Sequence, residues 1–465
     1  MAQLTDDCFA FDGPLLPVAE AERLISARVT PVSGRVTVPL RAALGRVLAA
    51  DVVAPVDLPP FDNSAVDGYA VRGDDIDAAG ERRLVIVDRI AAGHSGSHAV
   101  KAGEAVRIFT GAPMPVGADT VFMQEDCRID GDHVIVPPGL WRGANRRLGG
   151  EDIRAGAVAL RAGRRLSAQD VALAAALGLT ELDVKRRVRV ALFSTGDEIA
   201  EPGSPLTGAA LYDSNRYLLG SLFARFGAEV TDLGILHDEP KTLAQGIATA
   251  ARGHDLVLTS GGVSTGEADY VRAAVESVGR IVFWRVAIKP GRPVAMGVIP
   301  GGQTGEAAAF VGLPGNPVAV FVTFVLVVRP LLLRLAGALP EPLVAMPARA
   351  TFSYKKRKGR REYVRVALHT AADGTIEAVK YPQDGAGVLT SLTETDGLAE
   401  LGEDVTAIEP GATVGFLSYA SLAAFTVSRP IPLLAPMIRT VATPGWGLSN
   451  RACQRCFKCR LYSWT

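Results

Sequence analysis

The fold of this chain is decided by the stretch Asp255-Leu-Val-Leu-Thr-Ser-Gly-Gly-Val-Ser-Thr-Gly-Glu-Ala-Asp269. Its apolar half is typical of a parallel strand that is covered on both faces, and its glycine-rich half leads into a helix. In open α/β sheets, ligands collect at the carboxyl ends of such strands, and glycines followed by a helix N-terminus suit a phosphate group. Taken alone, the loop fits a structural turn as well as it fits a phosphate site.

Two neighbouring stretches repeat this arrangement. The strand expected at 188–193 ends in Ser194-Thr-Gly-Asp-Glu198, and Gly312-Leu-Pro-Gly-Asn-Pro317 precedes a long apolar run. Asn316 is a residue that helix N-caps favour, and Pro317 suits the first helical position. Three such loops within one α/β unit favour a functional interpretation over three unrelated turns.

Alternating strands and helices from Val188 to Leu335 predict a doubly wound α/β domain. We expect strands at 188–193, 229–235, 255–259 and 280–287, and helices at 214–226, 239–251, 268–278 and 317–328. The last helix holds the longest apolar run, 318–328, which is shorter than the ~20 residues that a membrane span needs. We therefore expect this helix to be buried.

Smaller domains precede the α/β domain. Helices are expected at 17–28 and 40–50, and a capping-box-like start at Ser167 opens a third helix. Between them, short apolar runs separated by Gly and Pro from 83 to 136 indicate a small β-rich domain. The helical domain at the N-terminus is therefore expected to be discontinuous.

After Pro342, short strands with an Asp-Gly hairpin turn at 373–374 predict a C-terminal β-barrel-like domain. In the remaining tail, three cysteines in C-x-x-C-x-x-C spacing lack the fourth ligand of a closed zinc or iron–sulfur site, so we expect poorly ordered chain there. The predicted boundaries are 7–54 with 146–187 (N-terminal domain), 55–145 (β-rich domain), 188–337 (α/β domain), 338–422 (C-terminal β domain) and 423–465 (tail).

The composition favours a small-molecule partner. Of the 465 residues, 48% are apolar and 21% charged, and 49 Lys and Arg match 49 Asp and Glu, so no charge bias toward nucleic acid or a membrane surface is visible. Met1–Asp12 carries acids and no apolar region of a secretory signal. With two isolated cysteines and three in the tail, we expect a reduced, cytoplasmic protein.

Three further stretches carry two interpretations each. The polar loop within Phe61–Val71 suits either an exposed turn or a loop that handles a metal or phosphate. Asn145-Arg-Arg147, next to two acids at 151–152, fits surface ion pairing as well as ligand binding. The basic run Lys355–Arg361 is usual for a solvated face, although the strand that follows could direct some of these charges at an anion.

Seven motifs follow one another along the chain. They are Pro59-Pro-Phe-Asp-Asn-Ser-Ala-Val-Asp-Gly-Tyr-Ala-Val-Arg72, Thr110-Gly-Ala-Pro113, Ser194-Thr-Gly-Asp-Glu-Ile199, Tyr212-Asp-Ser-Asn-Arg216, Ser260-Gly-Gly-Val-Ser-Thr-Gly-Glu-Ala-Asp-Tyr270, Ile288-Lys-Pro-Gly-Arg-Pro293 and Gly312-Leu-Pro-Gly-Asn-Pro317. In this order they resemble the molybdopterin molybdenumtransferase family, which includes bacterial MoeA and the C-terminal domain of gephyrin. The likeness extends from about Asp7 to Leu422 and leaves only the tail uncovered.

The resemblance implies a four-part fold and a homodimer, with a cleft between the α/β domain and the β domains to which the other subunit contributes. The implied reaction inserts molybdate into adenylylated molybdopterin with Mg²⁺, releases AMP and yields molybdenum cofactor. Such substrates require a site that neutralises several negative charges, and positioning with electrostatics could suffice without an enzyme nucleophile. Transient contacts with the upstream adenylyltransferase and with molybdoenzyme acceptors are also implied.

By motif match, the family's functional residues fall on positions in three groups. The catalytic group is Asp67, Thr110, Glu198, Asp238 and Asp269, of which Glu198, Asp238 and Asp269 are expected to hold Mg²⁺. The group expected to bind molybdate is Lys289, Arg292, Arg360 and Ser391. The group expected to cradle the nucleotide-linked pterin is Ser260, Gly261, Gly262, Ser264, Gly266, Pro314, Gly315, Asn316 and Pro317. Each of the acids fits a helix cap or a turn as well.

Arg285 and Arg292 stand where lysine is frequent in this family. The charge is kept, but a planar guanidinium and a compact ammonium present different geometry to an oxyanion. Two alternative functions stay open. The upstream molybdopterin adenylyltransferase resembles only the 188–335 unit, and a gephyrin-like scaffold is disfavoured because no second fused domain or long linker is visible.

Overall fold

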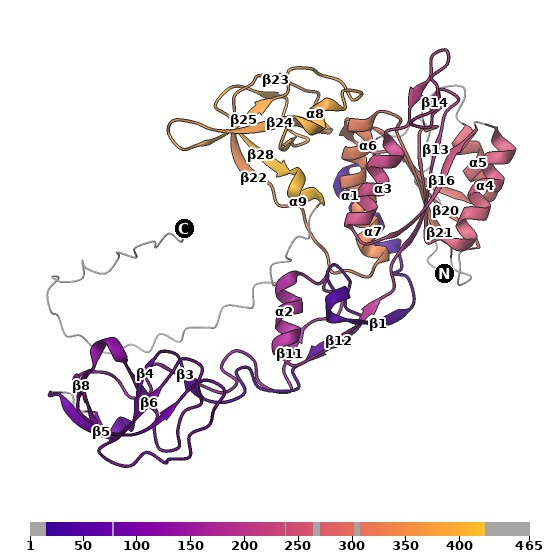
Figure 1. Ribbon diagram of the computed structural model, residues 1–465. Coiled ribbons are helices and arrows are strands. Elements are labelled where there is room, and N and C mark those ends of the chain that lie inside the picture. Colours follow the sequence, from indigo (N-terminus) through magenta and orange to yellow (C-terminus); the bar gives the residue numbers. More distant parts are fainter. Residues whose placement is uncertain (1–14, 77–78, 238, 264–269, 302–306, 424–465) are drawn as a thin grey trace, which may run out of the picture. The chain divides into compact units, whose positions relative to one another are not determined.

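A six-stranded sheet forms the centre of the α/β domain in this computed structural model (Figure 1). The structure describes residues 15–76, 79–237, 239–263, 270–301 and 307–423. The strands of the sheet are β13 (Arg189–Thr195), β16 (Glu229–Leu236), β17 (Leu256–Ser260), β18 (Arg280–Arg285), β20 (Pro293–Ile299) and β21 (Ala308–Leu313). They lie in the order β16-β13-β17-β21-β20-β18; the first four are parallel, whereas β20 is antiparallel to both β21 and β18.

Helices cover both faces of this sheet, which confirms the doubly wound prediction (Figure 1). They are α3 (Asn215–Arg225), α4 (Pro240–Gly253), α5 (Tyr270–Val278), α6 (Pro317–Thr323) and α7 (Arg329–Leu335). Successive strand residues point to opposite faces. Phe193 packs in one core with residues of α4 and α5, and its neighbour Leu192 packs in the other core with residues of α3, α6 and α7.

The apolar helix expected at 317–328 continues to Leu335 through one turn of π-helix at Phe324–Val328. Within the described residues, Pro317–Leu335 is the one helix long and apolar enough to cross a membrane, and 89% of its most apolar part is buried inside the protein. Phe324 meets the ring of Phe223 edge to face, with 5.4 Å between centroids. The helix is therefore part of the core, as the sequence predicted.

The N-terminal domain is discontinuous, as predicted. Its elements are α1 (Val18–Arg28), β1 (Arg35–Pro39), β2 (Val52–Val53), β11 (Val158–Leu160), α2 (Ala168–Ala176) and β12 (Glu181–Lys185). Strand β1 pairs with β12 and β2 pairs with β11, so segments more than a hundred residues apart form one unit. The capping box is also present, because Ser167 Oγ accepts from the Asp170 N–H while Asp170 Oδ2 accepts from the Ser167 N–H.

The prediction of a helix at 40–50 is wrong. Only a short 3-10 helix, η1 (Leu40–Ala42), forms there. Gly45 has φ +74°, and its N–H donates to the carbonyl oxygen of Leu166 at 2.8 Å. Leu48 donates in the same way to Arg164 at 2.9 Å. Hydrogen bonds to the returning part of the domain thus replace the local bonds that a helix would need.

The β-rich domain contains a six-stranded sheet in the order β7-β4-β6-β5-β9-β8. Its strands are β4 (Gly68–Val71), β5 (Arg82–Ile90), β6 (Glu104–Ile108), β7 (Thr120–Met123), β8 (Arg128–Asp130) and β9 (His133–Val136). A second pairing, between β3 (Asn63–Ser64) and β10 (Arg146–Arg147), joins the two ends of the domain. The short apolar runs that predicted this domain are its strands.

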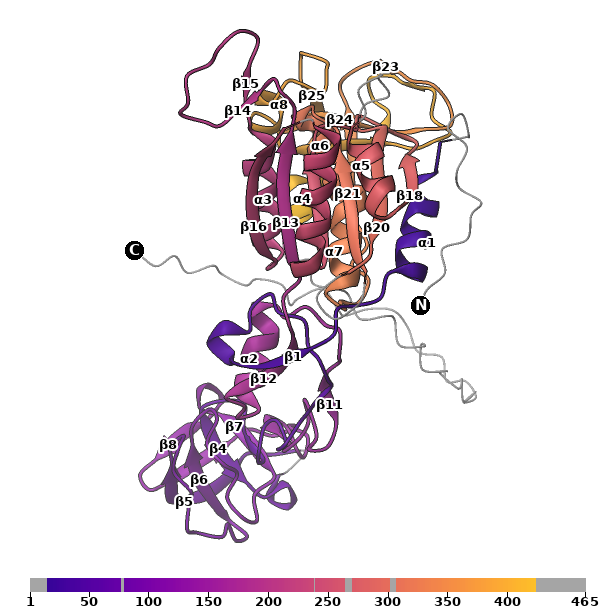
Figure 2. The same ribbon diagram turned by 90° about the vertical axis from the view of Figure 1, so that its right-hand side faces the viewer.

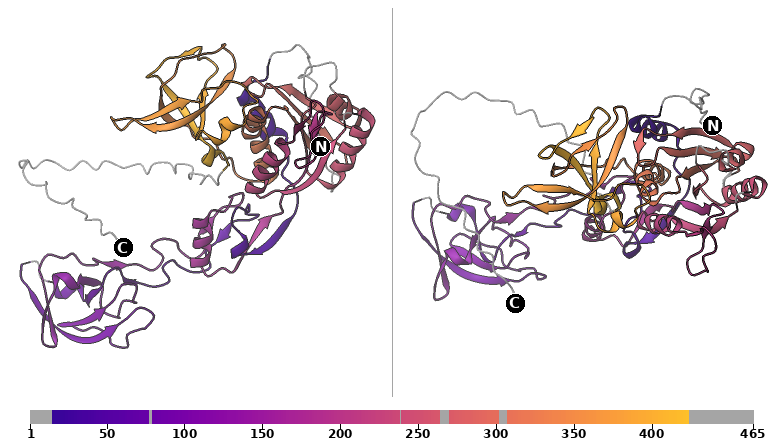
Figure 3. Two further views of the ribbon diagram at one scale, coloured as in Figure 1. Left: turned by 45° about the horizontal axis from the view of Figure 1, so that its top comes forward. Right: turned by 90° about the horizontal axis from the view of Figure 1, so that it is seen from above.

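The C-terminal domain is a closed five-stranded barrel (Figure 3). Its strands are β22 (Met346–Ala350), β24 (Arg361–Thr370), β25 (Ile376–Lys380), β26 (Gly397–Leu401) and β28 (Thr413–Ser418). The ring closes because β26 pairs with both β28 and β24. Gly374 has φ +81° in the turn between β24 and β25, where the Asp-Gly pair predicted a hairpin. The fold class is therefore confirmed, while the boundaries given above stay predictions.

A buried ionic triad connects three of these segments. Glu341, in the chain that leads to the barrel, accepts two hydrogen bonds from Arg165 of the N-terminal domain, at 2.8 and 2.6 Å. Arg329 at the start of α7 donates to the carbonyl oxygen of Glu341 at 2.9 Å and lies 3.6 Å from its carboxylate. The three side chains are only 3–4% exposed. Removing one member would take away charge compensation from buried groups.

We expect Glu341→Gln to lower the free energy of unfolding by about 3–5 kcal/mol, because the amide removes the negative charge that both buried guanidinium groups contact. Equilibrium urea unfolding, followed by circular dichroism, measures the change. Glu276→Gln is the matched control, because Glu276 pairs with Arg272 at an exposed position; its replacement should cost less than about 1 kcal/mol. Equal losses in the two variants would contradict a special role for the triad.

Candidate active site

The carboxyl ends of the four parallel strands β16, β13, β17 and β21 lie along one edge of the sheet (Figure 2). The register pairs Ser194 of β13 with Ser260 of β17. Ser260 pairs in turn with Leu313 of β21, and Thr195 pairs with Leu236 of β16. The glycine-rich loops after β13, β17 and β21 therefore start side by side. Ligands of open α/β sheets bind at such an edge.

The loop after β17 begins with two residues that must be glycine. Gly261 has φ +93° and Gly262 has φ +68°, conformations that other residues rarely adopt. A Cβ at Gly261 would lie 2.4 Å from the carbonyl oxygen of Thr195, and a Cβ at Gly262 would lie 2.3 Å from Val271. The loop backbone therefore packs directly on the end of β13. Four other predicted residues lie outside the described residues: Asp238, Ser264, Gly266 and Asp269.

Asn215, the first residue of α3, connects two of these loops. Its Nδ2 donates to Ser260 Oγ at 2.9 Å and to the carbonyl oxygen of Gly315 at 2.6 Å. Its Oδ1 is buried and accepts no hydrogen bond from the described residues, and the same is true of the hydroxyls of Ser194, Thr195 and Thr259. Because buried polar atoms are normally paired, this edge keeps hydrogen-bonding capacity for a bound group or water.

Arg216, next to Asn215, is a buried centre of charge that fixes this region. Its guanidinium contacts Asp213 at 3.0 Å and Asp232 at 2.5 Å, and it also pairs with Glu201. Burial by itself would lower the pKa of Arg216, but its hydrogen bonds to Asp232 and Asp213 and the charges of these two acids outweigh burial and raise that pKa. The ion pairs tie the segment that contains β14 (Ile199–Ala200) and β15 (Leu211–Tyr212) to α3 and β16. Asn215 was not among the predicted site residues, although the motif Tyr212–Arg216 contains it.

Glu198 follows β13 and is exposed. Its carboxylate lies so close to Gly196 that a Cβ there would meet Oε2 at 2.7 Å. Carboxylate oxygens suit Mg²⁺, and Glu198 is the one described member of the three acids expected to hold it. In the described part of the chain, no group of three His, Cys, Asp or Glu residues is placed to hold a metal ion.

A basic pocket of about 640 Å³ lies between the α/β domain and the barrel. One acid, Asp384, is among the described residues that line it, and this acid pairs with Lys380 at 2.9 Å. The cationic residues of the lining are Lys289, Arg292, Lys355, Arg360, Arg365 and Lys380. This excess of positive charge suits a ligand with several negative charges. Pro314 and Asn316 also line the pocket, so the loop after β21 connects it to the edge of the sheet.

Lys289 and Arg360 share a buried acid behind the pocket. Glu362 is 1% exposed; its Oε2 lies 3.2 Å from Lys289 Nζ and its Oε1 lies 2.6 Å from Arg360 Nε. The Tyr354 hydroxyl donates to the same carboxylate at 2.8 Å and accepts from Lys289 at 3.1 Å. Glu362 and Tyr354 were not among the site residues predicted from the sequence. The signal that could have found Glu362 is one acid directly after a run of six basic residues within 355–361.

These contacts stabilise the charged forms of both Glu362 and Lys289. Burial would raise the pKa of Glu362, but the hydrogen bonds from Tyr354 and Arg360 and the charge of Lys289 outweigh it and lower that pKa. Burial would lower the pKa of Lys289, but its contacts with Tyr354 and Glu362 raise it instead. The ammonium and the carboxylate are therefore both ionised at neutral pH.

Ser391, predicted to bind molybdate, is fully buried and is not among the residues that line the pocket. Its hydroxyl accepts a hydrogen bond from Arg365 Nε at 3.1 Å and donates to the carbonyl oxygen of Val388 at 2.5 Å. Any effect of Ser391 on a ligand in this conformation would therefore act through Arg365.

Asn316 stands at the N-cap position of α6, but its side chain makes no capping hydrogen bond, contrary to the expectation from sequence. A loop of the C-terminal domain satisfies this helix end instead, because the N–H of Val318 donates to the carbonyl oxygen of Ala386 at 3.0 Å. The Asn316 side chain is exposed and lines the pocket, so it is available to a ligand.

Asp67 and Thr110 form a separate pair in the β-rich domain. The backbone N–H and the hydroxyl of Thr110 both donate to Asp67 Oδ1, each at 2.8 Å. These two hydrogen bonds lower the pKa of the Asp67 carboxyl below its ordinary value. The guanidinium of Arg107 lies nearby, 4.8 Å from the ring centre of Tyr69 and 5.2 Å from that of Phe109. Neither Asp67 nor Thr110 lines the basic pocket.

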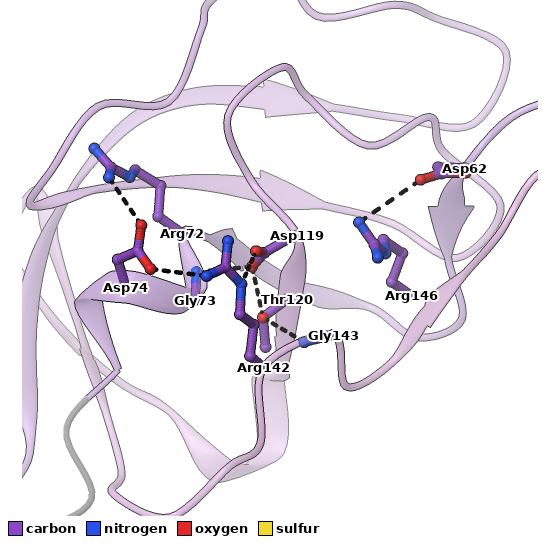
Figure 4. A network of polar contacts seen from close by, with 9 residues as sticks. All are labelled: Asp62, Arg72, Gly73, Asp74, Asp119, Thr120, Arg142, Gly143 and Arg146. Atoms are coloured by element: carbon purple, nitrogen blue, oxygen red, sulfur yellow. Dashed lines mark hydrogen bonds and ion pairs between the residues drawn. The ribbon is translucent and has the colours of Figure 1, made fainter.

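A network of ion pairs fixes the loops of this domain (Figure 4). Arg142 donates to Asp119 at 2.6 Å and to Asp74 at 2.9 Å, and Asp119 also accepts from the N–H of Gly73 at 2.7 Å. Arg146, in the stretch with two open interpretations, lies 3.7 Å from Asp62. Arg147 pairs with Glu151, one of the two acids of that stretch, at 2.8 Å, so the structure shows surface ion pairing, one of the two interpretations, at Arg147.

Glycine-rich loops lie at the carboxyl edge of the α/β sheet, next to a positively charged pocket. This arrangement is typical of proteins that bind phosphate-bearing or other multiply charged anions. Comparisons with known proteins give the family. The sequence profiles of the MoeA N-terminal region (domain I and II), of a probable molybdopterin binding domain and of the MoeA C-terminal region (domain IV) match residues 16–178, 191–334 and 347–419. The chain belongs to the MoeA family, as its motifs predicted.

Similar proteins cover most of the chain. A molybdopterin molybdenumtransferase from Haemophilus influenzae is 37% identical over 377 residues, which are 81% of this chain and 91% of that protein. A protein of the same name from Nostoc sp. is 38% identical over 384 residues, 81% of this chain and 87% of that protein. The crystal structure of a molybdopterin biosynthesis moeA protein from Pyrococcus horikoshii matches with a TM-score of 0.71 at 31% identity, over 87% of this chain and all of that one.

We expect Gly261→Ala to destabilise the α/β domain by about 1–3 kcal/mol, because the added methyl group meets the Thr195 carbonyl oxygen in a backbone conformation that alanine disfavours. Thermal unfolding measures the loss. Gly315→Ala is the matched control, since a Cβ there meets no atom within 4 Å; it should change stability by less than about 0.5 kcal/mol. A similar loss in both variants would contradict the close packing of this loop.

The two perturbed pKa values predict a wide pH range for anion binding. Because the pKa of Lys289 is raised in the folded protein, its pairing is present below the ordinary lysine pKa and is lost as the pH rises through the folded value. Because that of Glu362 is lowered, its pairing is present above the ordinary glutamate pKa and is lost as the pH falls through the folded value.

The affinity of the pocket for molybdate, measured by calorimetric titration, should therefore vary less than about twofold between about pH 6 and pH 9. A midpoint near pH 8 that disappears in Lys289→Arg would contradict the raised lysine pKa.

Proposed function

We propose that this chain is a molybdopterin molybdenumtransferase, which inserts molybdate into adenylylated molybdopterin and releases AMP. The observation that carries the proposal is that the glycine-rich edge of the sheet and the basic pocket, which both suit anions, adjoin each other. The glycine-built edge at Gly261 and Gly315 suits the phosphates of a nucleotide-linked pterin, and the basic pocket suits an oxyanion. Pro314 and Asn316 belong to both, so the two substrates would lie next to each other.

The residues of the chain act by binding and orientation. Lys289, Arg292 and Arg360 would hold molybdate, a substrate, through its oxygens. The loops after β17 and β21 would hold the phosphates with the pterin dithiolene directed toward the pocket. Mg²⁺, when bound by Glu198 with Asp238 or Asp269, would polarise the pyrophosphate. No protein nucleophile is required, because proximity and fixed charge supply the rate enhancement.

A homodimer is part of this proposal. Asp67 and Thr110 do not line the pocket of their own chain, although their pairing keeps the Asp67 carboxylate ionised. In a dimer, the β-rich domain of the partner subunit would bring this pair to the cleft. The balanced charge and the cysteine content support a cytoplasmic location, where transient contacts with the upstream adenylyltransferase and with acceptor enzymes would pass substrate in and product out.

The test is conversion of adenylylated molybdopterin by the purified full-length protein. AMP release should require both molybdate and Mg²⁺. Lys289→Ala should lower kcat/KM for molybdate by at least about tenfold, because the pocket loses one of the two cations that contact Glu362. A parallel reaction with ATP and molybdopterin but no molybdate should give no adenylylated product. Product in that reaction, or AMP release that is independent of molybdate, would overturn the proposal.

A further inference from the structure

The buried carboxylate of Glu362 has more partners than any single ion pair requires. It lies on β24, and β19 (Ile288–Lys289), which leads out of the α/β domain, pairs with this strand in a parallel register that sets Lys289 opposite Glu362. Arg360 lies two residues before it and Tyr354 comes from β23 (Tyr354–Lys355). Glu362 thus gathers groups from three separate strands or loops. All three partners line the basic pocket, whereas Glu362 does not.

Some N–H donors of Lys289 and Arg360 are left for a ligand. The Lys289 ammonium has three N–H groups; one donates to Tyr354 and one faces Glu362, so one is left. Arg360 uses Nε for Glu362, and its two terminal amino groups donate to no other residue in the described ranges. The Lys289 side chain is 50% exposed and that of Arg360 is 26% exposed, while Glu362 is 1% exposed. Glu362 therefore occupies the inner donors and leaves the outer ones to the pocket.

We propose that Glu362, with the hydroxyl of Tyr354, is a positioning residue that sets the spacing and direction of Lys289 and Arg360 for a tetrahedral oxyanion. This inference rests on the function proposed above and goes beyond it, since it assigns a role to residues that do not contact the ligand. Without the carboxylate, the two cations repel each other and their long side chains regain rotational freedom. With it, an oxyanion meets one N–H of Lys289 and the planar fork of Arg360 in a fixed arrangement.

The carboxylate also sets the charge that the ligand meets. Lys289 and Arg360 contribute two positive charges and Glu362 one negative charge, so the cluster has a net charge of +1. Because this net charge is small, the placement of the donors has a larger effect on oxyanion binding than the charge alone. Geometry also separates molybdate from the smaller sulfate ion, which has the same charge.

The test compares wild type, Glu362→Gln and Glu403→Gln. Glu403 is the matched control, because it is a carboxylate of the same domain that pairs with Arg361 at 3.1 Å and is not in the pocket lining. We expect Glu362→Gln to raise KM and Kd for molybdate about tenfold and to reduce the preference for molybdate over sulfate. KM for adenylylated molybdopterin should stay within about twofold of wild type. Glu403→Gln should change none of these constants.

Two measurements separate this inference from the proposed function. Direct calorimetric titration with molybdate needs no turnover, so weaker binding by Glu362→Gln supports the positioning role even if no AMP is formed. Tyr354→Phe is the second variant; it removes only the hydroxyl that joins Lys289 to Glu362 and should raise Kd for molybdate about threefold. Unchanged or tighter molybdate binding in either folded variant would overturn the inference, as would an equal effect of Glu403→Gln.

Discussion

The basic pocket depends on one short strand pairing. Only two residues, Ile288 and Lys289, form β19, yet they pair with Arg361 and Glu362 of the barrel, and the N–H of Arg361 donates to the carbonyl oxygen of Ala287 at 2.9 Å. This pairing attaches the barrel to the α/β domain and sets Lys289 beside its acid. The pocket between the domains exists because backbone hydrogen bonds fix the register of this pairing. Side-chain ion pairs alone would not fix the register.

Charge is distributed in the same way at three places in the molecule. Around Arg216, Glu341 and Glu362, a buried group of one sign is surrounded by two or more partners of the opposite sign. Desolvation of each buried charge costs free energy, so each centre is stable only when all of its partners are present. Two of the centres support the candidate site directly: Arg216 holds the segment between Glu198 and Asn215, and Glu362 holds the cations of the pocket. The third, at Glu341, connects Arg165 of the N-terminal domain to Arg329 of α7.

Much of the architecture followed from local pattern. Local patterns predicted strands β13, β16, β17 and β18 and helices α3 to α6 of the α/β domain, the capping box at Ser167 and the hairpin at Gly374, because each depends on residues near one another in sequence. The helix at 40–50 failed because its backbone bonds to residues 164–166, which no local window contains. Strands β20 and β21 were also not predicted, although the stretch from Gly312 to Pro317, which contains the end of β21 and the loop after it, was identified.

For the site, the sequence by itself determined the chemical inventory: glycine loops after apolar strands, and the cations Lys289, Arg292 and Arg360, which the family motifs identify and the structure gathers in one pocket. Only the tertiary structure decided how that inventory is used. In the structure, Ser391 contacts Arg365 and does not line the pocket, and Asn316 lines the pocket and does not cap its helix. Asn215, Tyr354 and Glu362 connect groups of the site to one another. The physical reason is that residue type fixes charge and hydrogen-bonding capacity, whereas pairing between distant strands fixes which of those groups meet.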